Sequence, residues 1–174
     1  MTMVLRSCES VEDLVAIGNG SCPGCGGALR KWGQARWRVI RGSVGQWGFR
    51  PSRVRCAACG VTQVVLPADV LVRRRDAVEV VGSAWRFFAA GSGARRVSRL
   101  LGVPMETVRG WLRRLRALAR VMHVARSSDQ RNLGRALADM VAEAKLDGCH
   151  EEVELWRFVA YRSQGQLLCN TSWP

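Results

Sequence analysis

Two Cys-x-x-Cys pairs constrain the fold of this chain more than any other feature of its sequence. The first lies in Cys22-Pro23-Gly24-Cys25-Gly26-Gly27 and the second in Cys56-Ala57-Ala58-Cys59-Gly60. Two residues between paired cysteines let one tight turn direct both sulfurs at a metal ion, and the glycine after each pair supplies the positive φ that closes such a turn. Four thiolates leave no open coordination position, so the pattern predicts one structural Zn²⁺ bound by Cys22, Cys25, Cys56 and Cys59.

Redox pairs are the alternative interpretation of these motifs. A thioredoxin-like pair requires a βαβ context, whereas the residues around both pairs resemble short strands and turns. We expect the strands of a small antiparallel zinc ribbon at 28–31, 36–41, 50–56 and 62–66, with a Gly/Ser loop at 42–48. The other cysteines, Cys8, Cys149 and Cys169, lack paired spacing. Cys149 and His150 could form a ligand pair, but the four paired cysteines already complete one metal site without them.

The charge of the chain indicates what it binds. Its 174 residues include 27 Lys or Arg and 14 Asp or Glu, a net charge of +13. Residues 1–126 carry 22 basic and 7 acidic groups, whereas residues 127–174 carry 5 and 7. Nearly all the cations are arginines, whose guanidinium group suits bidentate contact with phosphate or guanine. A polyanionic partner is therefore expected for the first 126 residues.

Arginines and tryptophans alternate along the predicted ribbon. Candidate nucleic-acid contacts there are Arg36, Arg38, Arg53 and Arg55. Trp32, Trp37 and Trp47 lie among them and could stack on bases. The alternative, which we favour for any single tryptophan, is that these side chains cover a ribbon too small to have its own core.

A helix-turn-helix is predicted after the ribbon. Val78, Val81, Trp85 and Phe88 have helical spacing, a short helix follows at 94–101, and Gly102 precedes a longer basic helix that opens at Pro104 and runs through Arg116. We expect the longer helix to bury Val108, Trp111, Leu112 and Leu115 against Val97, Leu100 and Leu101.

The outward face of that helix would then enter the DNA major groove. Residues predicted to read bases are Met105, Glu106, Arg109 and Arg113; residues predicted to contact phosphates are Arg95, Arg96, Arg99, Arg114 and Arg116. An amphipathic helical hairpin with a solvated basic face is the alternative. Gly110 in mid-helix costs about 1 kcal/mol relative to Ala, and its purpose stays open between close approach to DNA and close approach to a neighbouring helix.

The order CPGCGGALRKWG, RPSRVRCAACGVTQVVLP and LGVPMETVRGWLRR resembles a family of uncharacterised actinobacterial proteins, a domain of unknown function. It is also similar to the N-terminal DNA-binding part of insertion-sequence transposases. The resemblance covers roughly residues 22–116. It implies DNA binding with Cys22, Cys25, Cys56 and Cys59 as ligands, and it supplies no target sequence.

The sequence after the predicted helix-turn-helix contains no recognisable set of catalytic residues. Asp139, Glu143 and Asp147 share one predicted helix face, as solvated acids do, and no P-loop or nucleophile motif is present. We therefore expect no enzymatic activity and no small-molecule substrate. The near-neutral segment 127–174 should form helices that either cap the core or make a homodimer.

Together these patterns predict an α+β chain with four parts: a short N-terminal helix in 1–20, a zinc ribbon in 21–68, a helix-turn-helix domain in 69–126 and a helical extension in 127–174. The expected function is sequence-specific binding of double-stranded DNA, as a transcriptional regulator or mobile-element accessory protein. A transposase remnant and a zinc-ribbon adaptor for RNA or RNA polymerase are the alternatives. Without a signal peptide or an apolar span in the sequence, a cytoplasmic, nucleoid-associated location is expected and no membrane partner.

Overall fold

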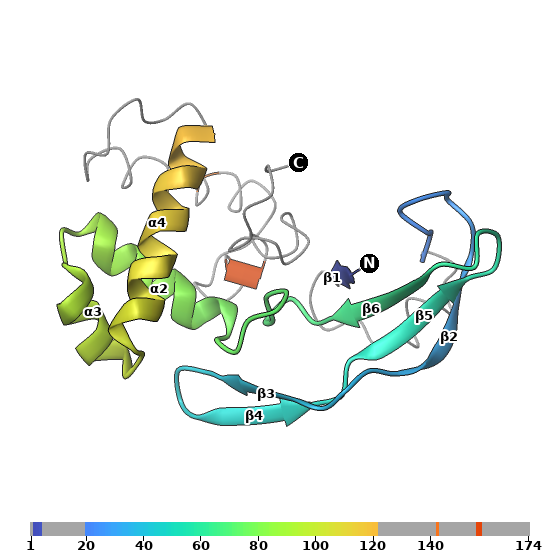
Figure 1. Ribbon diagram of the computed structural model, residues 1–174, viewed down its shortest axis with the longest axis horizontal. Coiled ribbons are helices and arrows are strands. Elements are labelled where there is room, and N and C mark those ends of the chain that lie inside the picture. The colour runs from blue at the N-terminus through green and yellow to red at the C-terminus, as the bar shows by residue number, and fades with distance from the viewer. Residues whose placement is uncertain (1, 5–19, 122–141, 143–155, 158–174) are drawn as a thin grey trace.

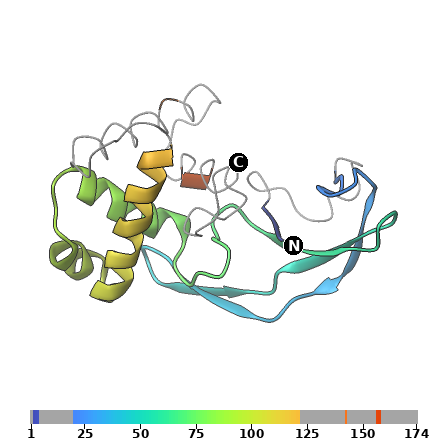
Figure 2. The same ribbon diagram turned by 45° about the horizontal axis from the view of Figure 1, so that its top comes forward.

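A computed structural model of the chain describes residues 2–4, 20–121, 142 and 156–157 (Figure 1). Within these ranges the protein is α+β, as the sequence predicts: it has a four-stranded sheet, a separate two-stranded sheet and three helices. In Figure 1, and in the turned view of Figure 2, the helices lie on the left, strands 29–34, 52–56 and 62–66 extend to the right, and the hairpin of 38–41 and 46–49 lies between them. None of the described helices combines the length and the apolar character needed to cross a membrane.

The larger sheet has the strand order β1-β6-β5-β2. Its members are β1 (Thr2–Val4), β2 (Leu29–Gln34), β5 (Ser52–Cys56) and β6 (Thr62–Leu66). Strand β5 is antiparallel to both β2 and β6, and β1 pairs parallel with β6. Side chains alternate across β5 and β6, so Val54, Cys56 and Val65 are buried together with Cys22 and Leu29 in a small core.

Residues 2–4 form a strand, whereas the sequence predicts a short helix within residues 1–20. Thr2–Val4 form strand β1, with Thr2 opposite Val64 and Val4 opposite Leu66. A short helix was predicted within residues 1–20, and residues 5–19 lie outside the described ranges.

A second hairpin consists of β3 (Arg38–Arg41) and β4 (Gln46–Phe49). The sequence predicts a loop over 42–48, but the turn is shorter, because the amide of Gly42 donates to the carbonyl of Gly45 at 2.7 Å and β4 begins at the next residue. Pairing of Trp47 with Ile40, and of Phe49 with Arg38, brings apolar side chains onto one face of the hairpin. Ile40 is buried in the main core.

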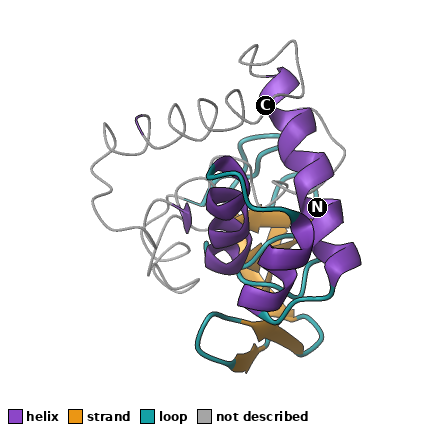
Figure 3. Ribbon diagram, turned by 90° about the vertical axis from the view of Figure 1, so that its left-hand side faces the viewer, coloured by secondary structure: helices purple, strands orange, loops and turns teal. Residues whose placement is uncertain are grey.

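The helices are α2 (Val78–Ala89), α3 (Ala94–Leu101) and α4 (Met105–Val121), and they pack on one another (Figure 3). The limits of α3 agree with those predicted. Gly102, in the left-handed conformation with φ 61°, ends this helix and Pro104 precedes the next.

Side chains from all three helices form the main core, which includes Trp85, Phe88, Val97, Val108 and Trp111. One prediction for this core is wrong. Leu100 is 55% exposed, whereas Leu101, one turn after Val97, packs against the core as predicted. The side chain of Leu115 lies outside the described set.

Part of the C-terminal segment packs on the helices. Trp156 is buried, with its ring edge-on to Trp85 at 6.3 Å between centroids. Its indole lies so close to Gly82 of α2 that a Cβ at that position would overlap it. Arg157 Nε donates to Asp69 Oδ1 at 2.6 Å. At these two residues the segment caps its own chain. Of the other predicted helical residues after 126, Ala142 is described, as an exposed helical residue, and the rest lie outside the described ranges.

Candidate metal centre and nucleic-acid interface

The four paired cysteines converge at one end of the larger sheet. Their sulfurs all lie within 4.8 Å of one another, with Cys22–Cys59 at 3.8 Å and Cys25–Cys56 at 3.5 Å. All four are free thiols. Tetrahedral coordination with metal–sulfur bonds of about 2.3 Å places sulfurs about 3.8 Å apart. The predicted ligand set is therefore confirmed as a group close enough to hold one metal ion.

Each pair lies in a turn of the same design. After Cys22, the amides of Cys25 and Gly26 both donate to the Cys22 carbonyl; after Cys56, the Gly60 amide donates to the Cys56 carbonyl at 3.1 Å. Gly26 and Gly60 have φ of 73° and 72°, the left-handed conformation that the trailing glycines were expected to supply. The two turns are joined by the Ala57 amide, which donates to the carbonyl of Ala28 at 2.9 Å.

Gly27 lets the two turns approach each other. A Cβ at this position would lie 2.7 Å from the Ala58 Cβ and 3.0 Å from the Cys56 sulfur. Distances this short are well inside van der Waals contact, so only glycine fits without displacing the second turn. The sequence did not single out Gly27, because the requirement arises from a contact across the two turns.

Hydrogen bonds around the sulfurs shift the pKa values of Cys56 and Cys25 in opposite directions. The amide of Cys59 donates to the Cys56 sulfur at 3.5 Å and is the main cause that lowers the pKa of Cys56 to about 6. The Gly27 amide lowers the pKa of Cys25, but the hydrogen bonds of Cys25 with the side chains of Cys56, Cys59 and Cys22, together with burial, outweigh this effect and raise the pKa of Cys25 to about 11. The Cys56 thiol therefore ionises readily, and it shares the proton that the neighbouring Cys25 thiol keeps.

Gln63 is a second residue of the site that the sequence analysis missed. Its side chain is 1% exposed, and Nε2 donates to the Cys22 sulfur at 3.5 Å. A buried amide donor of this kind stabilises a thiolate and orients it, as partners outside the ligand set commonly do. Glutamine is usually exposed, so the sequence carried no signal that Gln63 would be buried on β6 beside Cys22.

The arginines predicted as ribbon contacts differ in their surroundings. Arg55 Nε donates to the Gly60 carbonyl at 3.1 Å, and its guanidinium lies 4.6 Å from the centre of the Trp32 ring, so this side chain supports the second cysteine turn. Arg36 is exposed, whereas Arg38 and Arg53 are half-buried.

The tryptophans of the strands keep large exposed surfaces. Trp32 is 56% exposed and Trp37 is 58% exposed. The Trp37 ring lies against Gly48 of β4, where a Cβ would overlap it, and Trp47 contacts Phe49 with ring centres 5.3 Å apart. These side chains cover backbone and neighbouring rings while leaving flat aromatic surface to solvent.

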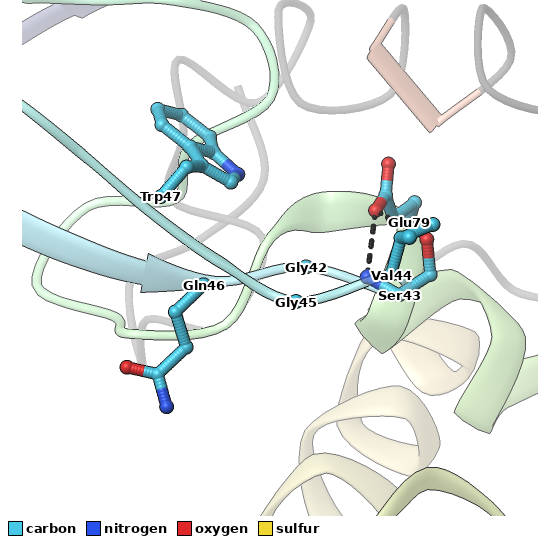
Figure 4. Close-up of a pocket in the computed structure, with 7 residues that line it drawn as sticks. All are labelled: Gly42, Ser43, Val44, Gly45, Gln46, Trp47 and Glu79. Atoms are coloured by element: carbon cyan, nitrogen blue, oxygen red, sulfur yellow. Dashed lines mark hydrogen bonds between the residues drawn. The ribbon is translucent and has the colours of Figure 1, made fainter.

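The hairpin is held against the helices at its tip. Ser43 donates from both its amide and its hydroxyl to Glu79 Oε1 in the first turn of α2, at 3.0 and 2.8 Å (Figure 4). Figure 4 shows Glu79 directed at the turn, beside Val44. Directly before this turn, Arg41 Nε donates to the buried carboxylate of Asp76 at 2.7 Å. These contacts fix the hairpin relative to α2.

The first turns of α4 expose the face that the sequence predicts to read bases. Glu106, Arg109 and Arg113 are exposed, and Met105 is half-buried. Arg109 Nη1 and Glu106 Oε1 form an ion pair at 2.6 Å. On the opposite face Val108 and Trp111 are buried, so the helix presents one polar and one apolar side.

The predicted phosphate contacts fall into two groups. Arg95, Arg96 and Arg99 are exposed on α3, whereas Arg114 and Arg116 are half-buried on α4. Arg114 Nη1 donates to the Gly110 carbonyl at 3.1 Å. The same nitrogen would be the nearest neighbour, at 3.2 Å, of a Cβ added at Gly110. No other described helix therefore approaches this glycine closely.

Comparison with known proteins adds no assignment: no family model, curated protein or solved structure significantly matches the chain.

Proposed function

We propose that this chain binds double-stranded DNA sequence-specifically, with α3, the turn at Gly102 and α4 acting as a helix-turn-helix and α4 as its recognition helix. The observation that carries the proposal is the polarity of α4. Its first turns bury Val108 and Trp111 and expose Glu106, Arg109 and Arg113. A recognition helix needs this division, because its N-terminal residues contact base edges while the other face packs on the preceding helix.

The turn between α3 and α4 supports this proposal. Gly102 adopts φ 61°, the Val103 amide donates to the Ser98 carbonyl at 3.2 Å, and Ser98 Oγ donates to the Val103 carbonyl at 2.7 Å. Buried Val103 closes the turn against the core. The turn is therefore short and fixed, as the positioning of a recognition helix requires.

The charge of α3 also supports the proposal. Arg95, Arg96 and Arg99 are exposed on a helix that has no acidic residue in its first turn. In a helix-turn-helix the first helix crosses the phosphate backbone, where such arginines neutralise phosphates without reading sequence. The pairing of Arg109 with Glu106 would be exchanged for contacts to guanine and cytosine edges on binding.

The four-cysteine cluster is proposed to hold one structural Zn²⁺. Four sulfur donors at near-tetrahedral separation suit zinc, which would link the two turns and complete the ribbon that carries β2, β5 and β6. The role of the metal is to fix the fold, since the four ligands fill its coordination positions. Zinc content of the purified protein, compared with a Cys56→Ser variant, tests this part: unchanged content would contradict it.

The DNA proposal is tested by selecting bound sequences from random duplex DNA. The expected outcome is enrichment of a short motif, or of paired half-sites if the chain acts as a dimer. A pool that remains random at moderate salt, while the protein stays bound, would exclude sequence recognition by α4. A palindrome upstream of the protein's own gene would favour a regulator, whereas flanking inverted repeats or a neighbouring recombinase gene would favour a transposase-related role.

The exposed tryptophans favour a second candidate function, a zinc-ribbon adaptor that binds RNA or another single strand. Trp32 and Trp37 offer flat surfaces next to the basic strands, and bases stack on such surfaces in single-strand binders. Competition separates the two functions. If duplex DNA fails to displace labelled single-stranded RNA, and Trp37→Ala weakens RNA binding, the second candidate stands and the first falls.

A further inference from the structure

Four arginines line a hollow beside the second hairpin, and the lining residues include none from α4. Its volume is about 310 Å³, and it is lined by Arg38, Val39 and Ile40 of β3 and by Arg73, Arg74 and Arg75. None of these lining residues is acidic. Like charges held together repel one another, so the arrangement favours an anion between them.

The backbone holds the arginine run next to β3. The Arg41 amide donates to the Arg75 carbonyl at 2.6 Å, and the Ala77 amide donates to the Arg41 carbonyl at 2.9 Å. This pairing makes a parallel bridge between Arg41 and Asp76. The Asp76 carboxylate, which lies next to the run in sequence, is bound by Arg41 at 2.7 Å. The nearest acid in the sequence is thereby occupied by an arginine outside the hollow.

Arg73 carries an unusual backbone conformation. Its φ is 58°, and among the described residues it is the only non-glycine residue with a positive φ. Such a conformation is unfavourable for a residue with a side chain, and strain of this kind is concentrated at binding and catalytic sites. Glycine would adopt it freely, so the presence of arginine indicates that the guanidinium serves a purpose there.

We propose that this hollow is a phosphate-binding site and that it holds a phosphodiester of the duplex backbone when the protein is on DNA. The chemistry is that of a tetrahedral oxyanion, which guanidinium groups bind through paired N–H donors. Strand β3 forms one wall of the hollow, through Arg38, Val39 and Ile40. The assignment to DNA rests on the proposed function, whereas the phosphate site itself does not.

The site is tested first without DNA. The full-length protein, labelled with ¹⁵N, is titrated with inorganic pyrophosphate while the arginine Nε–H signals are followed by NMR. Saturable shifts of the Arg38, Arg73 and Arg75 signals, with Arg30 and Arg50 little affected, support the site. Arg30 and Arg50 are suitable references because both are exposed and neither lines the hollow. Equal, non-saturating shifts of all five signals overturn it.

A second arm identifies the source of the phosphate. Binding of a short random-sequence duplex is measured over a range of salt for wild type, for Arg73→Gly combined with Arg75→Gln, and for the charge-matched control Arg30→Gln combined with Arg50→Gln. Loss of one phosphate contact lowers the slope of log affinity against log salt by about 1. The hollow variant should show this decrease together with a loss of affinity, and the control should change less.

The outcomes separate this inference from the proposed function. If wild type binds duplex DNA and both double variants weaken it equally, the hollow is not a backbone contact and the inference is overturned, while DNA binding stands. If pyrophosphate binds the hollow but duplex DNA does not bind the protein, the phosphate site stands and DNA is excluded as its source. Arg73→Gly alone guards against misfolding, since it relieves the positive φ and should leave the thermal unfolding temperature nearly unchanged.

Discussion

Replacing Gly27 with alanine should weaken metal binding without altering any ligand. The added Cβ would lie 2.7 Å from the Ala58 Cβ and 3.0 Å from the Cys56 sulfur. Carbon atoms approach favourably to about 3.5–4.0 Å, so the second cysteine turn must move by roughly 1 Å. Overpacking of this extent costs about 1–3 kcal/mol. If this cost falls on the metal-bound state, affinity decreases about 5- to 150-fold.

Gly24→Ala is the matched control, because it lies in the same turn and its Cβ would meet only the Cys22 sulfur, at 3.9 Å. Zinc affinity of the three proteins is measured by competition with a chromophoric chelator, and refolding in excess zinc shows whether each is folded. Equal affinities for Gly27→Ala and Gly24→Ala would refute the claim that the two turns must touch to assemble the four sulfurs.

Three further predictions concern the metal centre and the helices. Zinc affinity should rise about tenfold per pH unit above about pH 6, because Cys25, with a pKa of about 11, must lose its proton to solvent when the metal binds. Cys56, with a pKa of about 6, is already ionised there and adds to the pH dependence only at lower pH. A flat profile between neutral and mildly alkaline pH would contradict this. Gly110→Ala should stabilise α4 by about 0.5–1 kcal/mol in urea unfolding, since the flexible end of Arg114 is the one group of the described residues that lies near the new Cβ; destabilisation would show that the space is needed. Trp156→Ala should lower the free energy of unfolding by about 3–5 kcal/mol, because its ring is buried against Trp85 and Gly82; a loss below 1 kcal/mol would show that this contact does not stabilise the fold.

Local sequence signals predicted the elements that have strong boundaries. Gly93 and Gly102 flank α3, and Pro67 follows β6, so the limits of both elements agree with expectation. These residues act through their own backbone conformations, which require no knowledge of distant contacts. Each cysteine pair was also predictable because it defines its own turn. The clustering of the two pairs was predictable because four thiolates complete one metal site.

Features that depend on contacts between distant segments were missed. Strand β4 was taken for part of a loop because Gly45 and Gly48 weaken a strand pattern, yet Gly48 lies under the Trp37 ring. Leu100 and Leu101 were both expected in the core, but neighbouring residues of a helix point in different directions, and Leu101 packs there while Leu100 is exposed. The role of Gly27 follows from the contact between the two cysteine turns, and that of Gln63 from the strand pairing that brings β6 beside Cys22; a single sequence specifies neither.

The described C-terminal residues bear on whether the segment after residue 126 caps the core or forms a homodimer. Capping of the core and homodimer formation both fitted the apolar spacing after residue 126. Trp156 and Arg157 contact their own chain through Trp85, Gly82 and Asp69. Capping therefore applies at these residues, and a homodimer remains a prediction for the rest of the segment.

The most direct test of the DNA-binding account compares Arg109→Ala with Arg95→Ala on two duplexes, the selected sequence and a scrambled one. Arg109 is exposed on the face of α4 proposed to read bases, and Arg95 is exposed on α3. Loss of a base contact should reduce the ratio of the two affinities by about 5- to 150-fold, equivalent to about 1–3 kcal/mol, whereas Arg95→Ala should weaken both duplexes alike. An unchanged ratio for Arg109→Ala, or equal effects of the two substitutions on it, would contradict recognition by α4.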